Sequence, residues 1–211
     1  MEINNNNYPF RLIEQKEQSK NLVIVLPGAA YTTQAPLLHF TTGLFYTKGF
    51  DVLHINYSFN REEMAALSVE EFTKNVLLAI DNAINSKEYH NYFIVAKSIG
   101  TIALSYLQQN TAFHNAKLIW LTPLLQRDDV FNAMISSYKK GICIIGDKDT
   151  CFIEDRFEKL KTNHHLQLKL VEGGNHSLEI DGEPIESIET VKSVISAIND
   201  FISLSWQNRL E

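Results

Sequence analysis

The chain has 211 residues and a formal charge of −6, with 45% hydrophobic and 21% charged residues. This composition is typical of a globular protein and excludes a disordered or fibrous chain. The negative charge argues against nucleic-acid binding, which needs clustered lysine and arginine. No apolar run reaches the ~18 residues that a transmembrane helix requires, so we expect no membrane association.

The N-terminal segment and the cysteine content set further expectations. Residues 1–7 have neither the basic region nor the apolar core of a secretory signal, and we expect them to form a disordered tail. Cys143 and Cys151 are too few for a disulfide framework, and no Cys/His pair has zinc spacing. We therefore expect a cytoplasmic protein without a metal ion or organic cofactor.

Short apolar segments alternate with helical patterns along the rest of the chain. An edge strand is expected at residues 8–15, and buried strands at 22–26, 52–57, 92–96, 118–121, 142–145 and 166–171. Helical patterns occur at 67–83, 102–107, 128–138 and 191–202. This alternation predicts an α/β fold with a doubly wound, mostly parallel sheet flanked by helices. Because no Pro- or Gly-rich linker interrupts the pattern, we expect one domain over residues 8–211.

One strand end carries the pattern of a catalytic serine. Residues 96–100, Ala-Lys-Ser-Ile-Gly, match G-x-S-x-G with alanine in the first glycine position, between a predicted strand and a predicted helix. A serine on such a sharp turn holds its hydroxyl clear of the sheet and beside the positive end of the helix. Ser98 is therefore the predicted nucleophile. The alternative is an ordinary strand-to-helix turn with an N-capping serine.

Two later strand ends carry the groups that a catalytic serine requires. His176 follows a Gly-Gly pair after the strand at 166–171, and Asp149 lies beyond the strand at 142–145. A serine hydroxyl needs a base to accept its proton and a third group to orient that base. We therefore predict that His176 is the base for Ser98 and that Asp149 is the orienting acid.

The acid and the base both have alternatives. Asp147 is the nearest alternative acid, and its other interpretation is a helix cap or an acceptor for a loop amide. Asp128 and Asp129, after the strand at 118–121, are more distant alternatives. Among the other histidines, His54 lies within a predicted strand, so we expect it to be a packed or hydrogen-bonded core residue.

Backbone amides near the predicted nucleophile are expected to stabilise an oxyanion. The first is the amide of Ile99, the residue after the serine, and the second is the amide of Ala29, in the loop after the strand at 22–26. The alternative for the Pro-Gly pair in that loop is a plain turn. Three side chains in or near loops at this edge are predicted substrate contacts, with core packing as the alternative: Tyr31, Phe59 and Leu125.

Two residues close in sequence to the predicted triad, Lys97 and Cys151, are expected to have no catalytic role. Lys97 directly precedes the predicted nucleophile, and we expect it to be solvated or ion-paired rather than to contact an anionic substrate. Cys151 follows shortly after Asp149 and is expected to be a small packing residue of that loop.

Together these segments resemble the α/β-hydrolase superfamily over residues 22–204. The resemblance rests on the serine turn, on Gly-Asp-Lys-Asp at 146–149, on Gly-Gly-Asn-His at 173–176 and on the chain order Ser, Asp, His. Leu-Pro-Gly-Ala at 26–29 replaces the His-Gly of many members. The resemblance implies a serine hydrolase without metal or cofactor, closest to small lidless esterases and dienelactone-hydrolase-like members. Residues 123–140 leave room for one helix but for no substantial cap.

The expected function is hydrolysis of an ester-like bond of a small-molecule substrate through an acyl-enzyme at Ser98. The alternatives are a thioesterase or peptidase with the same triad, and a non-catalytic binding protein of hydrolase fold. A nucleotide-binding protein is disfavoured because no phosphate-binding glycine motif follows the first strands. Because His176 must be neutral to act as a base, we expect activity to rise with pH through roughly 6 to 7. The sequence predicts no oligomeric state.

Overall fold

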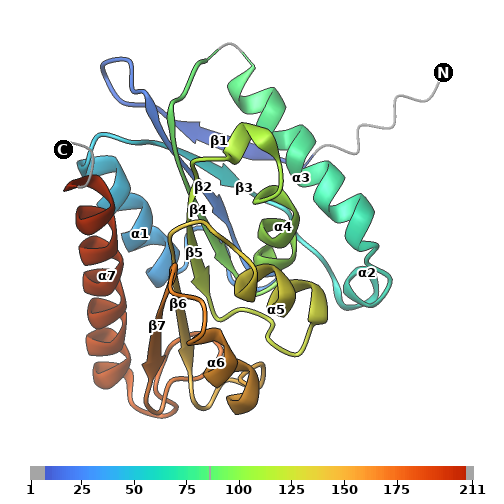
Figure 1. The fold of residues 1–211 in the computed structure, drawn as a ribbon, viewed down its shortest axis with the longest axis vertical. Helices are drawn as coiled ribbons and strands as arrows, with labels where there is room; N and C mark the ends of the chain where they lie inside the picture. Colours follow the sequence, from blue (N-terminus) through green and yellow to red (C-terminus); the bar gives the residue numbers. More distant parts are fainter. Residues whose placement is uncertain (1–7, 86, 208–211) are drawn as a thin grey trace.

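The computed structural model describes residues 8–85 and 87–207 (Figure 1). The expected tail at residues 1–7 lies outside these ranges. The strands match the predicted segments closely, and in chain order they are β1 (Phe10–Ile13), β2 (Asn21–Leu26), β3 (Asp51–Ile55), β4 (Asn91–Lys97), β5 (Lys117–Leu121), β6 (Gly141–Gly146) and β7 (Leu166–Val171).

These strands form one seven-stranded sheet in the order β1-β3-β2-β4-β5-β6-β7. Neighbouring strands pair in parallel, except that β1 runs antiparallel to β3. The predicted mostly parallel sheet is thus confirmed. The residues of β3, β5 and β6 are all buried, because helices cover both faces of the sheet, which explains why their sequences lack polar alternation.

Helices cover both faces of this sheet. They are α1 (Pro36–Thr47), α2 (Arg61–Ala65), α3 (Val69–Ile84), α4 (Gly100–Leu107), α5 (Asp128–Ile135), α6 (Glu154–Leu160) and α7 (Pro184–Gln207). Figure 1 shows α1 and α7 side by side on one face, with α3, α4 and α5 on the other. The four predicted helical patterns correspond to α3, α4, α5 and α7. The segment between β5 and β6 holds α5 and no cap domain, as predicted.

The sequence patterns missed α1, α2 and α6. In α1 the apolar residues do not form a single stripe, because Leu38 is buried while Phe40 is 55% exposed. The other two helices have only five and seven residues, too few for a helical period to stand out.

The side chains of β4 alternate between two cores. Ile94 and Ala96 pack into the core beneath α3 and α4, whereas Phe93 and Val95 pack into the core beneath α1 and α7. Because successive side chains of a strand point to opposite faces, Lys97 continues the second row. The last residue of β4 therefore lies on the face that α1 and α7 cover.

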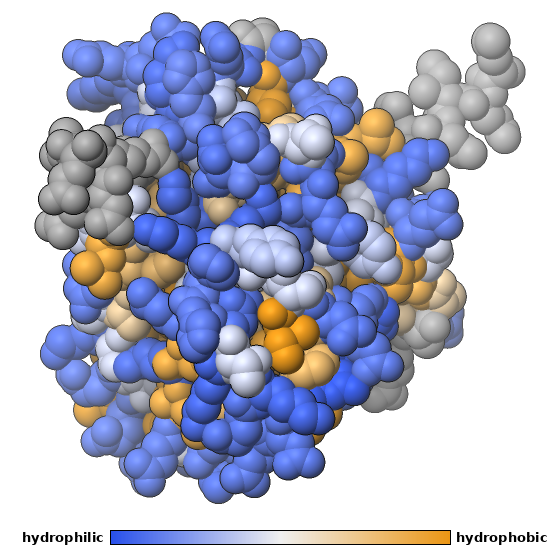
Figure 2. Space-filling view, in the orientation of Figure 1, coloured by the Kyte–Doolittle hydropathy of each residue, from blue (hydrophilic) through white to orange (hydrophobic). Residues whose placement is uncertain are grey.

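The surface in Figure 2 is mainly hydrophilic, with small hydrophobic patches that include several over α7. Large apolar side chains exposed on α7 are Ile185, Ile188 and Leu204. Within the described part of the chain, no helix combines the length and the hydrophobicity needed to cross a membrane.

Candidate active site

Ser98 lies on a sharp turn between β4 and α4. Its φ of +52° falls in the left-handed region, which residues with side chains rarely adopt. The turn is held because the Ser98 amide donates to Leu121 O at 3.1 Å and the Thr101 hydroxyl donates to Ser98 O at 2.6 Å. A Cβ at Gly100 would lie 2.5 Å from Leu26 O, so only glycine allows α4 to begin this close to β2. The geometry is that of the predicted nucleophile turn.

The three residues predicted from separate strand ends meet at this turn. His176 Nε2 lies 2.8 Å from Ser98 Oγ, and His176 Nδ1 lies 2.8 and 2.9 Å from the two carboxylate oxygens of Asp149. The Asp149 side chain is fully buried, and that of His176 is 37% exposed. When the carboxylate is ionised, the ring carries its proton on Nδ1, which leaves Nε2 to accept from the serine hydroxyl. These three residues are called the triad below.

The loops that carry the acid and the base contact each other through their backbones. A Cβ at Gly146 would overlap the carbonyl of Gly174, and the Lys148 amide donates to that carbonyl at 3.0 Å. The Asp149 carboxylate also accepts from the Cys151 amide at 2.8 Å. Glycine at position 146 therefore lets the two loops approach closely enough to form the Asp–His hydrogen bonds.

The alternative acids serve other partners. The Asp147 carboxylate accepts from the Gly173 amide at 2.7 Å, which matches its other predicted interpretation as an acceptor for a loop amide. Asp128 and Asp129 each form an ion pair with an arginine. The carboxylate that contacts His176 is therefore that of Asp149.

The surroundings of His176 change its basicity. Burial disfavours the charged ring, but hydrogen bonding to Asp149 and Cys151 outweighs burial and raises the pKa of His176 to about 9, with the positive charge of Lys97 acting in the opposite direction. This value lies above the ordinary imidazole range on which the expected activity rise at pH 6 to 7 was based. The structure therefore moves that expectation to higher pH.

Lys97 is buried, which contradicts its expected solvation or ion pairing. Its Nζ donates to Thr122 Oγ1 at 2.8 Å and to the backbone carbonyl of His176 at 2.6 Å, and it lies 4.6 Å from the centre of the Tyr31 ring. Burial lowers the pKa of Lys97 to about 8. The expectation failed because alternation along β4 directs this side chain under α1 and α7 rather than to the surface.

The two predicted oxyanion amides belong to segments that adjoin the nucleophile. Ile99 directly follows Ser98, and Ala29 follows Gly28, where an added Cβ would lie 3.4 Å from Ser98 Cβ. Within residues 8–85 and 87–207, neither the Ile99 amide nor the Ala29 amide donates a hydrogen bond. Both loops thus run close to the serine side chain with amides available to an acceptor.

The three predicted substrate contacts differ in position. Tyr31 lies beside the serine turn, since an added Cβ at Gly28 would lie 3.2 Å from Tyr31 Cβ. Phe59 packs with Tyr8 and other aromatic rings at a separate cleft of about 420 Å³. Leu125 has no exposed surface and packs in the core. The prediction for Leu125 is therefore wrong, because a fully buried side chain offers no surface to a substrate.

The contact between Cys151 and the triad was not predicted. Potential ligand atoms of Asp149, Cys151 and His176 all lie within 4.8 Å of one another, the pattern of a possible metal site. Both ring nitrogens of His176 already face Asp149 or Ser98, so the triad accounts for this cluster without a metal ion.

The histidine expected in the core, His54, is buried, and its Nε2 lies 2.8 Å from a threonine hydroxyl.

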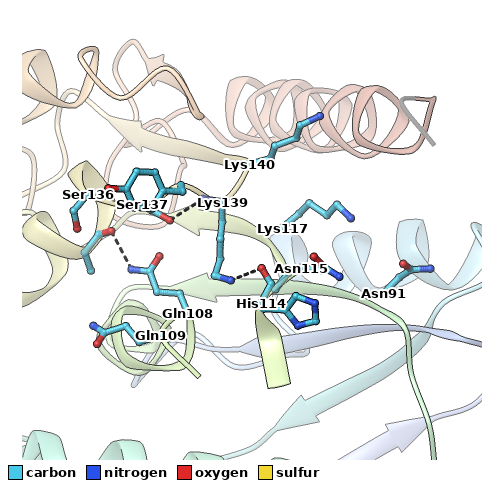
Figure 3. Close-up of a pocket in the computed structure, with 13 residues that line it drawn as sticks. Asn91, Gln108, Gln109, His114, Asn115, Lys117, Ser136, Ser137, Lys139 and Lys140 are labelled. Carbon is cyan, nitrogen blue, oxygen red and sulfur yellow. Dashed lines mark hydrogen bonds between the residues drawn. The ribbon is translucent and has the colours of Figure 1, made fainter. Parts of the chain in front are cut away.

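A separate pocket of about 750 Å³ lies at the amino ends of β4, β5 and β6 (Figure 3). Its polar groups include Lys139, whose Nζ donates to the carbonyls of Phe113 and His114, and Gln108, whose amide donates to Ala133 O. Since β4 has seven residues, about 20 Å of strand separates this pocket from the triad. These side chains thus donate to backbone carbonyls of α5 and of residues 113–114, and they form no nucleophile–base pair.

Comparison with known proteins matches the fold rather than a sequence family. No family model and no curated protein sequence matches the chain. A protein of unknown function from Agrobacterium tumefaciens is 20% identical, with a TM-score of 0.73, and the match covers 97% of this chain and 96% of that one. Est1E from Butyrivibrio proteoclasticus, solved with ferulic acid bound, is 13% identical with a TM-score of 0.71, covering 93% and 94%.

An α/β serine hydrolase without a lid from Xanthomonas campestris is also similar, at 13% identity and a TM-score of 0.66, covering 92% of this chain and 87% of that one. These identities are low, so the likeness concerns the arrangement of strands and helices. Together with the sheet order and the absence of a cap between β5 and β6, the matches show that the chain has the α/β-hydrolase fold.

Proposed function

We propose that the protein is a serine hydrolase that cleaves an ester-like bond of a small molecule. The observation that carries this proposal is the continuous hydrogen-bonded path from Ser98 Oγ through the ring of His176 to the buried carboxylate of Asp149. The structural neighbours support it, because they include esterases and serine hydrolases.

The first half-reaction forms an acyl-enzyme. Ser98 Oγ attacks the substrate carbonyl carbon while His176 Nε2 takes the hydroxyl proton, and Asp149 stabilises the imidazolium that results. The tetrahedral intermediate then collapses, and His176 gives the proton to the departing alcohol. In the second half-reaction water attacks the acyl carbon, His176 takes its proton, and the acid leaves as that proton returns to Ser98 Oγ.

The negative oxygen of each tetrahedral intermediate requires hydrogen-bond donors. We assign these to the backbone amides of Ile99, which directly follows the serine, and of Ala29, which follows Gly28 in the adjoining loop; neither amide donates to another described residue. Loss of one such donor costs about 10²- to 10³-fold in rate in comparable sites. Tyr31 is the predicted substrate contact that remains beside the serine, and Phe59 stays a prediction for a larger substrate.

Two alternatives use the same observations. A thioesterase or peptidase would need the same triad, whereas a non-catalytic binding protein would not need a buried acid hydrogen-bonded to the base. The ester hydrolase is preferred because the solved structures that share this fold include an esterase domain and lipolytic enzymes.

Hydrolysis of p-nitrophenyl acetate by the wild type and by Ser98→Ala tests the proposal. We expect the substitution to lower kcat by about 10⁴- to 10⁶-fold, with the circular dichroism spectrum unchanged. Equal rates for the two proteins would overturn the assignment of the nucleophile. A parallel panel of a thioester and a casein substrate separates the two enzymatic alternatives, since each predicts its own substrate to be turned over fastest.

A further inference from the structure

Lys97 joins three strand ends at a single buried ammonium group. The side chain begins at the end of β4, next to Ser98, and donates to Thr122 after β5 and to His176 after β7. The ring of Tyr31, in the loop after β2, lies on a further side at 4.6 Å. The ammonium group thus contacts the loop of the base and the loop that contains the predicted oxyanion donor Ala29, and it lies next to the turn of the nucleophile.

A cation in this position requires an explanation. Lys97 has no exposed surface, and within the described residues no carboxylate lies within ion-pair distance of its Nζ. Burying a charge without a close partner is unfavourable, so an apolar residue of similar size would pack here at lower cost to stability. Core packing alone therefore does not account for a lysine at this position.

Three residues with a strained backbone lie near the contacts of Lys97. Positive φ angles occur at Ser98 (+52°), Thr122 (+42°) and Leu178 (+61°). Lys97 precedes the first, bonds to the hydroxyl of the second, and bonds to the carbonyl two residues before the third. Such conformations persist only where surrounding contacts hold them in place.

We propose that Lys97 is a positioning residue for the triad, whose ammonium fixes the backbone carbonyl of His176 to the end of β4 and so keeps the imidazole within hydrogen-bonding distance of Ser98 Oγ. This inference rests on the proposed serine hydrolase function. Lys97 touches no reacting atom in this account; it acts through His176.

The charge of Lys97 has a second effect on the same histidine. The charged or titratable groups that act on Lys97 are Asp149, Cys151 and Glu179, and the Tyr31 ring packs against its ammonium. The positive charge disfavours the imidazolium form of His176, which leaves more of the ring neutral and able to accept a proton. Removing the charge while keeping the fold therefore favours the imidazolium form of His176 at pH values below about 8, where Lys97 of the wild type is charged.

Lys97→Met tests the inference, because methionine has a similar length but neither charge nor donors. We expect kcat for p-nitrophenyl acetate to fall about 10²-fold, as for other small displacements of a catalytic group, with little change in KM. The ratio of wild-type to variant kcat is expected to be largest below about pH 8, where the wild-type lysine is charged. A role in packing alone predicts that kcat and the pH profile of the folded enzyme are unchanged. That result would overturn the inference.

A matched pair at Thr122 keeps the test decisive if Lys97→Met does not fold. Thr122→Val removes one acceptor of the ammonium but retains its shape, whereas Thr122→Ser retains the acceptor. We expect kcat of the serine variant to exceed that of the valine variant by about tenfold, as for the loss of one hydrogen bond to a charged group. Equal kcat values for the two variants would contradict the positioning role.

The failure of this inference is distinguishable from the failure of the proposed function. The rate of labelling by a fluorophosphonate probe reports the reactivity of Ser98 without a substrate-specific binding step. If the wild type labels at Ser98 and Lys97→Met labels at the same rate, the hydrolase proposal stands and the positioning role is overturned. If the wild type does not label, both fall. Labelling that is slower in Lys97→Met than in the wild type supports both.

Discussion

At the amino ends of the strands, the polar side chains around Lys139 hydrogen-bond to backbone carbonyls of neighbouring loops (Figure 3), whereas at the carboxyl ends Ser98, His176 and Asp149 hydrogen-bond to one another. The first arrangement satisfies loop backbone groups. The second links a hydroxyl, a base and an acid in series. The pocket of about 750 Å³ lies at the amino end, whereas the proposed active site lies at the carboxyl end, so cavity size is not the observation that identifies it.

The carboxyl and amino ends of the strands also differ in backbone strain. Among the described non-glycine residues, positive φ angles occur in segments that follow the carboxyl end of a strand, at Ser98, Thr122 and Leu178. Strain of this kind costs about 1–3 kcal/mol per residue and is retained where function requires the conformation. The strained non-glycine residues thus lie at the same edge of the sheet as the proposed active site.

The largest expected effect separates two aspartates of one loop. Asp149→Asn leaves the ring of His176 in the wrong tautomer, and we expect kcat/KM for p-nitrophenyl acetate to fall about 10⁴-fold. Asp147→Asn keeps a side-chain oxygen that can accept from the Gly173 amide and removes only the negative charge that pairs with Lys148, so we expect at most a small decrease in melting temperature and no loss of kcat/KM. Equal losses of activity in the two variants would return Asp147 to consideration as the acid.

Two histidines provide the next contrast. Hydrogen bonding of His176 to Asp149 and Cys151 outweighs burial and raises its pKa to about 9, whereas burial and the charge of Arg11 lower the pKa of His54 to about 4. Because only the neutral ring of His176 accepts a proton, kcat/KM is expected to rise about tenfold per pH unit up to this pKa. NMR titration of the ring protons together with a pH–rate profile checks both values. A plateau of activity already at pH 7 would contradict the raised pKa.

Much of the fold followed from the sequence because buried parallel strands have near-continuous apolar sequences, as the confirmed strands 22–26 and 92–96 show. The triad was predictable because each member lies in the loop or turn that follows such a strand, and the carboxyl ends of parallel strands meet at one edge. The expectations of one domain over residues 8–211 and of a cytoplasmic location stay predictions.

The remaining features depend on packing that a linear pattern does not contain. Lys97 has the sequence context of a surface residue, and only its register on β4 places it beneath two helices. Leu125 lies near the predicted site in sequence, but its side chain turns into the core. Cys151 reaches His176 because its loop bends back toward Asp149. In each case the surroundings of the residue depend on the direction of its side chain, which its position along the chain does not reveal.

Glycine substitutions compare crowding at the carboxyl edge with an open helix position. Gly100→Ala places a Cβ 2.5 Å from Leu26 O, and we expect it to lower the free energy of unfolding by about 1–3 kcal/mol. Gly43→Ala, in α1, meets no atom within 4 Å, and we expect it to raise that free energy by up to about 1 kcal/mol through helix propensity. Urea denaturation measures both. A stabilising Gly100→Ala would show that α4 does not need this close approach.

The smallest effect is expected at the amino end. Lys139→Met removes two hydrogen bonds to loop carbonyls and is expected to lower the free energy of unfolding by about 1 kcal/mol. Its kcat/KM is expected to equal that of the wild type, because the triad is about 20 Å away. A loss of activity without a loss of stability would show that the two ends are coupled.

The most direct test of the account is covalent labelling with a fluorophosphonate probe, followed by peptide mass spectrometry. We predict a single adduct on Ser98 in the wild type, slower labelling in His176→Ala, and no adduct in Ser98→Ala. Labelling of Ser98→Ala at the wild-type rate, or no labelling of the wild type, would contradict the assignment of Ser98 as an activated nucleophile.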